Sequence, residues 1–260
     1  MIIKSIAIQG FRNISSEYIE LADGLNAFTG GNAQGKSSFL EAAYFILNGR
    51  SFRTPRDREL IMNGMPSASV KCLIDDDGLS LSISSKLAKT DNGADKSINA
   101  EGKKIRKLSE FIGKVGNSVF SRDDISLITG APAERRSFID RLISSISPVY
   151  LKNIKRYGEL IKKKNYLLKS GIFSGGLAEA INEQISGYAS FIEIARKGAS
   201  EKLSETAGAI YTEIFGMEQP FSIQYSPNIA ISNYTRETAS VEIYEALRKG
   251  LKEEDSRRMP

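Results

Sequence analysis

The sequence predicts an α/β fold in which a strand-rich part with one glycine-rich loop comes first and a helical part follows. Three observations lead to this prediction. Apolar and polar residues alternate along short runs near the N-terminus, which is typical of strands. The glycine-rich loop lies between a strand-like run and a helix-like run. From about residue 123, apolar residues recur at every third or fourth position, as on one face of a helix.

Composition places the chain in the soluble globular class. Its 260 residues suffice for one large domain or two medium ones. The chain has no histidine, which excludes histidine general bases and histidine metal sites. The net charge of +5 is compatible with a nucleic-acid partner but does not establish one.

The single cysteine and the absence of long apolar runs bear on location. Cys72 alone excludes an internal disulfide and a cysteine-based zinc cluster, and it lies in an alternating run that favours a buried strand thiol. No apolar run approaches the roughly 20 residues that span a bilayer, and the N-terminus does not resemble a cleavable signal. We therefore expect a cytoplasmic protein with no membrane contact.

The first part predicts several strands. Alternation favours strands at residues 2–8, 18–21, 67–75 and 79–86, and shorter ones at 25–29 and 117–120. The acidic turn Asp75-Asp76-Asp77-Gly78 joins two of them, and residues 90–95 are expected to form an exposed hairpin tip. A helix is expected at residues 37–47, directly after the glycine-rich loop.

The loop itself fits the G-x-x-x-x-G-K-[ST] pattern of phosphate-binding loops, or P-loops. It reads Gly30-Gly31-Asn32-Ala33-Gln34-Gly35-Lys36-Ser37. The glycines let backbone N–H groups surround phosphate oxygens, and the helix that follows adds its positive dipole end. Lys36 would reach the β- and γ-phosphates, and the Ser37 hydroxyl would ligate Mg²⁺. A glycine-rich turn that matches by chance is the alternative, which the flanking strand and helix disfavour.

The second part predicts helices. One helix begins near Pro132, since proline is favoured in the first turn. Apolar spacing predicts further helices at 151–168 and 181–214, and the short loop between them suggests an antiparallel hairpin. Residues 221–225 favour a strand and 240–254 a final helix.

A second acidic site, which P-loop enzymes use to hold Mg²⁺, is hard to find. No apolar strand ending in aspartate follows the helices. The nearest imitation, Asp75 to Asp77, lies at a predicted hairpin turn. Asp123 and Asp124 could reach a metal or its water, or could cap the helix that begins near Ile125.

Four motifs in order give the chain a resemblance to the RecF family of bacterial repair ATPases in the ABC/SMC superfamily. They are Gly10-Phe11-Arg12-Asn13-Ile14, the P-loop with Ser37-Ser38-Phe39-Leu40-Glu41-Ala42, Gly49-Arg50-Ser51-Phe52-Arg53-Thr54, and Phe120-Ser121-Arg122-Asp123-Asp124-Ile125 with Gly130-Ala131-Pro132-Ala133-Glu134-Arg135-Arg136. Two departures are Arg122, where the family usually has proline, and Lys164, where it usually has arginine.

The resemblance implies an ABC-type ATPase head with an incomplete sheet and an inserted helical domain. The implied division is residues 1–122 for the head, 123–217 for the helical domain and 218–260 for the start of a return to the head. Family members continue past the position of Pro260, where their ABC signature, Walker B carboxylates and D-loop lie. The resemblance therefore implies a C-terminally truncated member.

The implied cofactors are ATP and Mg²⁺. The P-loop residues from Gly30 to Ser37, with Ser38, would bind the nucleotide, and the family's matching element suggests that Arg12 and Asn13 touch it too. A solvated strand end is the alternative for Arg12 and Asn13. Ser37 would be the metal ligand.

Basic residues form two candidate DNA-binding groups. Arg50, Arg53, Arg56 and Arg58 could contact DNA phosphates or form a salt-bridged face with Asp57 and Glu59. The second group could bind phosphates or be a solvated helix face, and it consists of Lys152, Lys155, Arg156, Lys162, Lys163, Lys164 and Lys169. Arg135 and Arg136 could likewise bind DNA or pair with Glu134 and Asp140.

The resemblance implies an ATP-binding, DNA-binding protein of recombinational repair and replication-fork maintenance. Such a protein would clamp single-strand/double-strand junctions as an ATP-dependent homodimer, load recombinase and meet recombination mediator proteins. The alternative is a non-catalytic nucleotide-binding fragment or an interaction protein. Because the second acidic site is not found, we expect that this chain alone hydrolyses ATP poorly. A small P-loop kinase is disfavoured because the helical part is too long for a lid.

Overall fold

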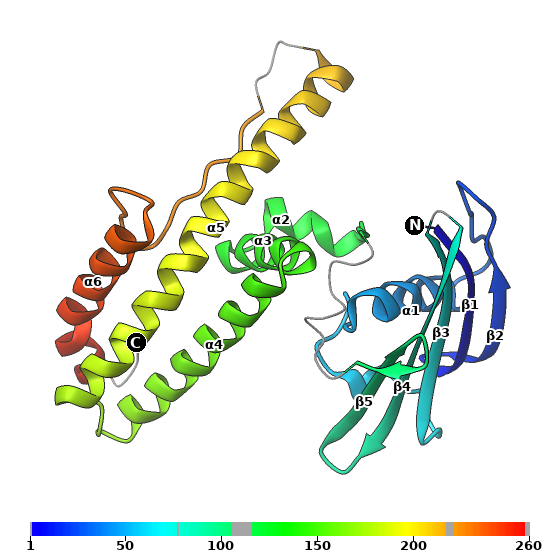
Figure 1. Cartoon of the computed structure of the whole chain (residues 1–260), viewed down its shortest axis with the longest axis horizontal. Helices are drawn as coiled ribbons and strands as arrows, with labels where there is room; N and C mark the ends of the chain where they lie inside the picture. The colour runs from blue at the N-terminus through cyan, green and yellow to red at the C-terminus, as the bar shows by residue number, and fades with distance from the viewer. Residues whose placement is uncertain (1, 77, 106–115, 217–220, 258–260) are drawn as a thin grey trace. The chain divides into compact units, whose positions relative to one another are not determined.

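The computed structural model describes residues 2–76, 78–105, 116–216 and 221–257, without the side chains of Asp123 and residues 252–257. The chain forms two compact units, Met1–Arg122 and Asp123–Pro260. Figure 1 shows a sheet with a helix beside it in the first unit and a group of helices in the second.

The first unit is built on an antiparallel sheet with the strand order β2-β1-β3-β4-β5-β6. Its strands are β1 (Ile2–Phe11), β2 (Ile14–Glu20), β3 (Ser67–Asp76), β4 (Leu79–Thr90), β5 (Gly93–Ala100) and β6 (Lys103–Lys104). The register places Cys72 of β3 between Ile6 of β1 and Ile83 of β4, so one face of the sheet is apolar. The strands predicted at residues 2–8, 18–21, 67–75 and 79–86 are confirmed.

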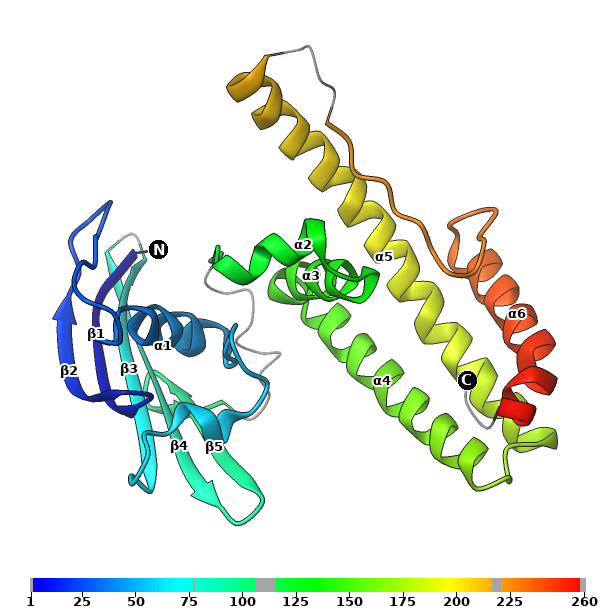
Figure 2. The ribbon, with the colours of Figure 1, turned by 180° about the vertical axis from the view of Figure 1, so that it is seen from behind.

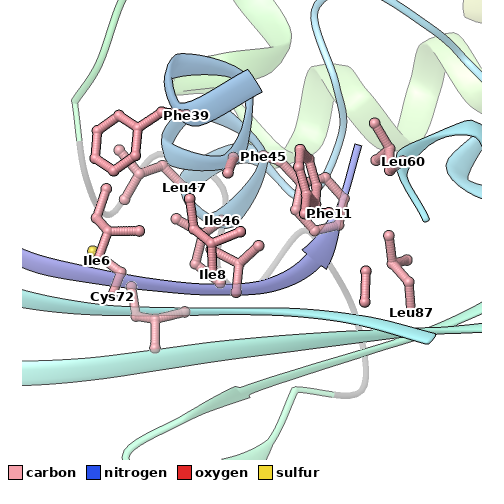
Figure 3. Packing of buried hydrophobic residues seen from close by; sticks show 14 of the residues in the cluster. Ile6, Ile8, Phe11, Phe39, Phe45, Ile46, Leu47, Leu60, Cys72 and Leu87 are labelled. Atoms are coloured by element: carbon pink, nitrogen blue, oxygen red, sulfur yellow. The ribbon is translucent and has the colours of Figure 1, made fainter. Parts of the chain in front are cut away.

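Helix α1 (Lys36–Asn48) packs against this apolar face and completes the core of the first unit. Phe39, Phe45 and Ile46 from the helix lie against Ile6 and Ile8 of β1 (Figure 3). Burial of each such side chain stabilises the fold by about 1.5–3 kcal/mol. The helix predicted at 37–47 is confirmed, and its packing fixes the position of the loop that precedes it.

Glycines in the left-handed region set both ends of α1. Gly35 has φ 91° at the N-terminal end, and Gly49 has φ 63° at the C-terminal end. A side chain would strain both conformations. The Gly49 N–H also donates to the Phe45 carbonyl at 2.7 Å, which closes the last turn.

Three predicted strands are wrong, namely residues 25–29, 117–120 and 221–225. A strand needs a neighbour for its backbone N–H and C=O groups, and no ladder within the described ranges pairs with these segments. Leu25 is 93% exposed, whereas Phe28 packs on the Phe39 ring with centroids 4.5 Å apart. The Ile223 N–H donates to the Ser204 hydroxyl at 2.8 Å instead of to a strand.

The second unit is helical. After η3 (Arg122–Ile125), its helices are α2 (Ser126–Thr129), α3 (Pro132–Ile146), α4 (Pro148–Lys169), α5 (Gly175–Phe215) and α6 (Arg236–Arg257). Proline stands in the first turn of α3, as expected. Helices α4 and α5 lie side by side and antiparallel, which confirms the predicted hairpin (Figure 2).

Two apolar clusters hold these helices together. Leu168 of α4 packs with Ile181 and Ile185 of α5 near the hairpin turn. Farther along, Tyr150 of α4 and Ile192 of α5 pack with residues of α3. Helix α6 packs along α5. The assignment of residues 218–260 to a segment that returns to the head stays a prediction.

A network of charged and polar side chains links α3, α4 and α5. Arg196 of α5 binds both carboxylate oxygens of Asp140 at 2.8 Å, and the Tyr150 hydroxyl donates to Asp140 at 2.6 Å. Of the two alternatives for Arg135 and Arg136, pairing with Asp140 is therefore not supported, because Asp140 pairs with Arg196. Arg135 instead donates to the carbonyls of Leu127 and Gly130, at 3.3 and 3.0 Å.

None of the helices in the described part of the chain is long and apolar enough to cross a lipid bilayer.

Candidate nucleotide-binding site

The P-loop adopts the curled backbone that its sequence predicts. Gly30 has φ 140°, Ala33 has φ 62°, and Gly35 has φ 91° where the loop enters α1. The first intrahelical bond of α1 runs from the Phe39 N–H to the Gly35 carbonyl at 2.8 Å. N–H groups in the first turn of a helix have no acceptor within the helix, so they suit an anion at this end.

Lys36 folds back over the loop. Its Nζ donates to the carbonyls of Gly30 and Gly31, at 2.8 and 2.5 Å. The amine therefore lies directly above the curled backbone, where phosphate oxygens could replace these carbonyls as acceptors. Ser37 is exposed on the first turn of α1, so its hydroxyl could serve as one metal ligand.

The turn between β1 and β2 lies against the P-loop. Asn13 Nδ2 donates to the Ala33 carbonyl at 2.7 Å, and the Ser38 hydroxyl donates to Asn13 Oδ1 at 2.7 Å. A Cβ atom at Gly35 would lie 3.3 Å from Ile14, so this turn also limits the space behind the loop. The sequence prediction that places Asn13 near the P-loop agrees with these contacts.

A cavity of about 930 Å³ adjoins Asn13 and Ser38. Five of its side chains are cationic and one is a carboxylate, so the cavity favours an anionic ligand. The lining consists of Arg12, Asn13, Ser38, Arg53, Arg56, Arg58, Glu59, Ile61, Met62, Asn63 and Lys89.

Backbone and side-chain hydrogen bonds fix the segment that forms one wall of this cavity. The segment contains η1 (Asp57–Leu60). The Arg12 N–H donates to the Leu60 carbonyl at 2.7 Å, and Lys96 of β5 donates to Asp57 at 2.6 Å. The wall is therefore anchored to both the β1–β2 turn and β5.

A buried carboxylate holds two of the cavity's arginines. The Glu41 side chain is 0% exposed and accepts hydrogen bonds from Arg12 at 2.7 and 3.0 Å and from Arg53 at 3.1 Å. The sequence prediction missed Glu41. A signal was available, because Glu41 lies three residues after Ser38 and four before Phe45 and so shares the buried face of α1.

The arginine cluster after α1 divides between the salt-bridged surface that was one of the two alternatives and a buried ion pair that was not expected. Arg53 pairs with Glu41, whereas Arg56 lies 3.5 Å from Glu59 on the surface. Arg53, Arg56 and Arg58 all line the cavity that also contains Arg12. Arg50 is half-buried. Three of these four arginines thus belong to the same cavity as Arg12 and Asn13.

The lysine-rich group on α4 is mostly an exposed face. Its exposed members are Lys152, Lys155, Arg156, Lys162, Lys163 and Lys169. The interpretation of Lys164 as a DNA contact is wrong, because Lys164 is 0% exposed and its amine lies 5.4 Å above the Phe173 ring. With 3.6 residues per turn, the other members fall on one side of the helix.

Those acidic candidates that the structure describes do not form a metal cluster. Asp75 accepts from the Gly78 N–H at 2.8 Å in the β3–β4 turn, and Asp77 lies outside the described residues. Asp124 lies within η3, and the N-cap position of α2 is occupied by Ile125, so Asp124 does not stand at that position; the Asp123 side chain is not described. Within the described ranges, no three cysteine, histidine or acidic side chains gather as metal ligands do.

Comparison with known proteins agrees with this architecture. A family model for an AAA ATPase domain matches residues 1–172. The DNA replication and repair protein RecF of Macrococcus caseolyticus is 34% identical over 253 residues, covering 94% of this chain and 65% of that protein. RecF of Shouchella clausii is 31% identical over 241 residues, covering 90% and 63%. The chain thus spans less than two thirds of the length of these relatives.

A solved structure supports the same fold. The recombination mediator protein RecF with ATP, from the RecFOR pathway, superposes with a TM-score of 0.90 at 27% identity, covering 100% of this chain and 69% of that one. The predicted ATPase-head fold with a helical domain is confirmed by this match and by the family model.

Proposed function

We propose that this chain binds ATP at the P-loop and works on DNA in replication and repair. The chain belongs to the AAA ATPase domain family and is homologous to the RecF proteins, which supports this proposal. The observation that carries the proposal is the continuity of the P-loop with the arginine-lined cavity. Asn13 and Ser38 line that cavity, and Asn13 also bonds to the loop carbonyl of Ala33.

The triphosphate is assigned to the P-loop. Lys36 would exchange its bonds to Gly30 and Gly31 for phosphate oxygens, and the first turn of α1 would add its free N–H groups. The nucleotide site comprises Gly30 to Ser38 with Arg12 and Asn13. The phosphate chain would extend from the P-loop toward the cavity at Asn13 and Ser38, because the cationic lining of the cavity suits its charge.

Mg²⁺ would be held in part by Ser37. Its hydroxyl is exposed at the mouth of the loop, and bound Mg²⁺ would supply positive charge to the phosphates. Magnesium usually keeps several waters and takes only one or two protein ligands beside the phosphates. One hydroxyl at this position therefore fits the ion.

The DNA contact is assigned to the exposed face of α4. Lys152, Lys155, Arg156, Lys162 and Lys163 lie there, with Glu159 as an interspersed acid. A stripe of cations along a helix can follow a phosphate backbone. By homology with RecF, the partners would be single-strand/double-strand junctions and recombination mediator proteins, with recombinase loading by an ATP-dependent homodimer.

Calorimetric titration of the purified chain tests the core of this proposal. ATP with Mg²⁺ should bind with a stoichiometry near one, and excess inorganic triphosphate should compete. The absence of ATP binding at millimolar concentrations would overturn the proposal. Adenosine binding without triphosphate competition would also contradict it, because the phosphates would then contribute nothing.

A further inference from the structure

Glu41 presents a fully occupied carboxylate in the interior of the first unit. Oε1 accepts from Arg12 Nη2 at 2.7 Å and from the Ser51 hydroxyl at 2.5 Å. Oε2 accepts from Arg12 Nε at 3.0 Å and from Arg53 Nη1 at 3.1 Å. A carboxylate offers about four acceptor sites, so this group has no capacity left for a ligand.

The donors to Glu41 come from separate parts of the chain. Arg12 lies just after β1, whereas Ser51 and Arg53 lie in the segment after α1. The Ser51 hydroxyl also accepts from the backbone N–H groups of Arg53 and Thr54, at 2.8 and 3.1 Å. Glu41 therefore anchors both arginines and the loop that carries Arg53.

The hydrogen bonds to Glu41 use only some of the N–H donors of the two arginines. A guanidinium carries five N–H donors. Arg12 uses three of them, two to Glu41 and one to the Glu59 carbonyl at 2.9 Å. Arg53 is 43% exposed, lines the cavity and gives one nitrogen to Glu41. Two cations against one buried carboxylate leave a net positive charge at the cavity wall.

We propose that Glu41 is a positioning residue that fixes Arg12 and Arg53 as a paired guanidinium clamp for the anionic part of the nucleotide. This inference rests on the proposed ATP site. Glu41 touches no ligand itself and acts through the two arginines. Without its charge, the arginines would lose their common anchor, and each would adopt several orientations in the cavity.

The test compares Glu41→Gln with the unsubstituted chain by calorimetric titration with ATP and Mg²⁺. Glutamine keeps the shape but replaces one acceptor oxygen with an amide that faces guanidinium donors. ATP affinity should fall at least fivefold. Glu17→Gln on exposed β2 removes the same charge far from any described contact of Glu41, and it should leave ATP affinity unchanged.

A double-mutant cycle separates positioning from a merely structural role. In the background Arg12→Lys with Arg53→Lys, which keeps both charges but removes the fork geometry, Glu41→Gln should cause less than a twofold further loss. If Glu41→Gln lowered ATP affinity by the same factor in the double-lysine background as in the unsubstituted chain, the inference would be overturned. Wild-type affinity of Glu41→Gln would overturn it as well.

Folding is checked by circular dichroism and thermal unfolding. If Glu41→Gln does not fold, Glu41→Asp replaces it, since aspartate keeps the charge but withdraws the carboxylate by one methylene. The same fivefold loss is expected, and wild-type affinity would overturn the inference. Failure of the proposed function is distinguishable, because the unsubstituted chain itself would then not bind ATP.

Discussion

Asn13 and Ala33 are joined by a 2.7 Å hydrogen bond from the side-chain amide of one to the carbonyl of the other. The bond ties the β1–β2 turn to the middle of the P-loop. Ala33 is a non-glycine residue with φ 62°, a conformation that L-residues seldom adopt without support. The strand-to-strand turn thus helps to hold the phosphate-binding backbone in its curled form.

Asn13→Ala should therefore weaken ATP binding as well as the fold. The substitution removes two hydrogen bonds, each worth about 1 kcal/mol to stability. We expect a roughly fivefold to tenfold loss of ATP affinity, equivalent to about 1–1.4 kcal/mol. Titration with ATP and Mg²⁺ measures it, with Asn99→Ala on β5 as the control. Unchanged affinity would show that the P-loop keeps its form without this bond.

Lys36→Ala should abolish measurable ATP binding. The amine already sits over the loop, 2.8 Å from the Gly30 carbonyl, where phosphate oxygens are expected. Fluorescence of a labelled ATP analogue provides the measurement, and Lys71→Ala on the exposed part of β3 removes an equal charge. If the Lys36 variant bound as tightly as the unsubstituted chain, the P-loop assignment would be wrong.

DNA binding should depend on salt through the exposed face of α4. Replacing Lys155, Lys162 and Lys163 together by alanine should reduce the slope of log affinity against log salt by about 2–3 units for duplex DNA. The control replaces three exposed lysines of the first unit, Lys71, Lys103 and Lys104. Equal slopes for both triple variants would move the DNA contact away from α4.

Lys164→Ala should behave differently from its neighbours. Its side chain is fully buried above Phe173, so the substitution leaves a cavity in the α4–α5 interface. We expect the free energy of unfolding to fall by about 2 kcal/mol, with an unchanged salt slope for DNA. Urea unfolding and the same binding assay check both parts.

Arg196→Ala should destabilise the helical unit. Arg196 is 11% exposed and binds Asp140, so its removal leaves a largely buried carboxylate without its cation. The free energy of unfolding should fall by about 2–3 kcal/mol in urea titrations. Arg156→Ala, which breaks the exposed pair with Glu159, should cost less than about 1 kcal/mol. Similar losses for both variants would contradict the buried character of the network.

Stability should decline in alkali partly through Cys72. Burial raises the pKa of this thiol from 9.0 to about 12. Between these two pKa values the folded chain keeps a proton that the unfolded chain loses. The contribution of the thiol to the free energy of unfolding is therefore full below pH 9 and is lost toward pH 12. In this range the free energy of unfolding should fall by about 1.4 kcal/mol per pH unit.

Urea unfolding of the sheet at pH 8, 9.5 and 11 measures this effect, and Cys72→Ala should show a shallower decline. Tyr150 should also contribute to the loss of stability at high pH, since burial and the Asp140 carboxylate raise the pKa of its hydroxyl. An identical decline in the Cys72 variant would mean that the thiol does not contribute.

The sequence predicted those helices and strands whose residue pattern is complete within one continuous segment. The P-loop motif located α1, Pro132 located the start of α3, and alternation located β3 and β4. Residues 25–29 have the same local character but are not a strand, because strand formation depends on a partner that the segment itself does not specify.

The site was predicted where one motif contains its residues or where the family resemblance supplies them, as for Asn13. Pairings between other side chains that are distant in sequence were missed. Lys36 and Ser37 follow from the motif alone. The pairing of Glu41 with Arg12 joins residues 29 positions apart, and Asp140 with Arg196 joins residues 56 apart. Such pairs depend on tertiary packing, which no local period encodes. The burial of Lys164 was missed for the same reason, since its neighbours Lys162 and Lys163 are exposed.

The sealed position of Cys72 makes the chain convenient for spectroscopy. A 0% exposed thiol at the centre of the sheet should not react with maleimide dyes in the folded state. The chain also contains no tryptophan. A cysteine pair introduced at Lys103 and Lys155 could therefore carry a donor and an acceptor fluorophore on a native background. One tryptophan placed beside the P-loop would report nucleotide arrival without interference from any other indole.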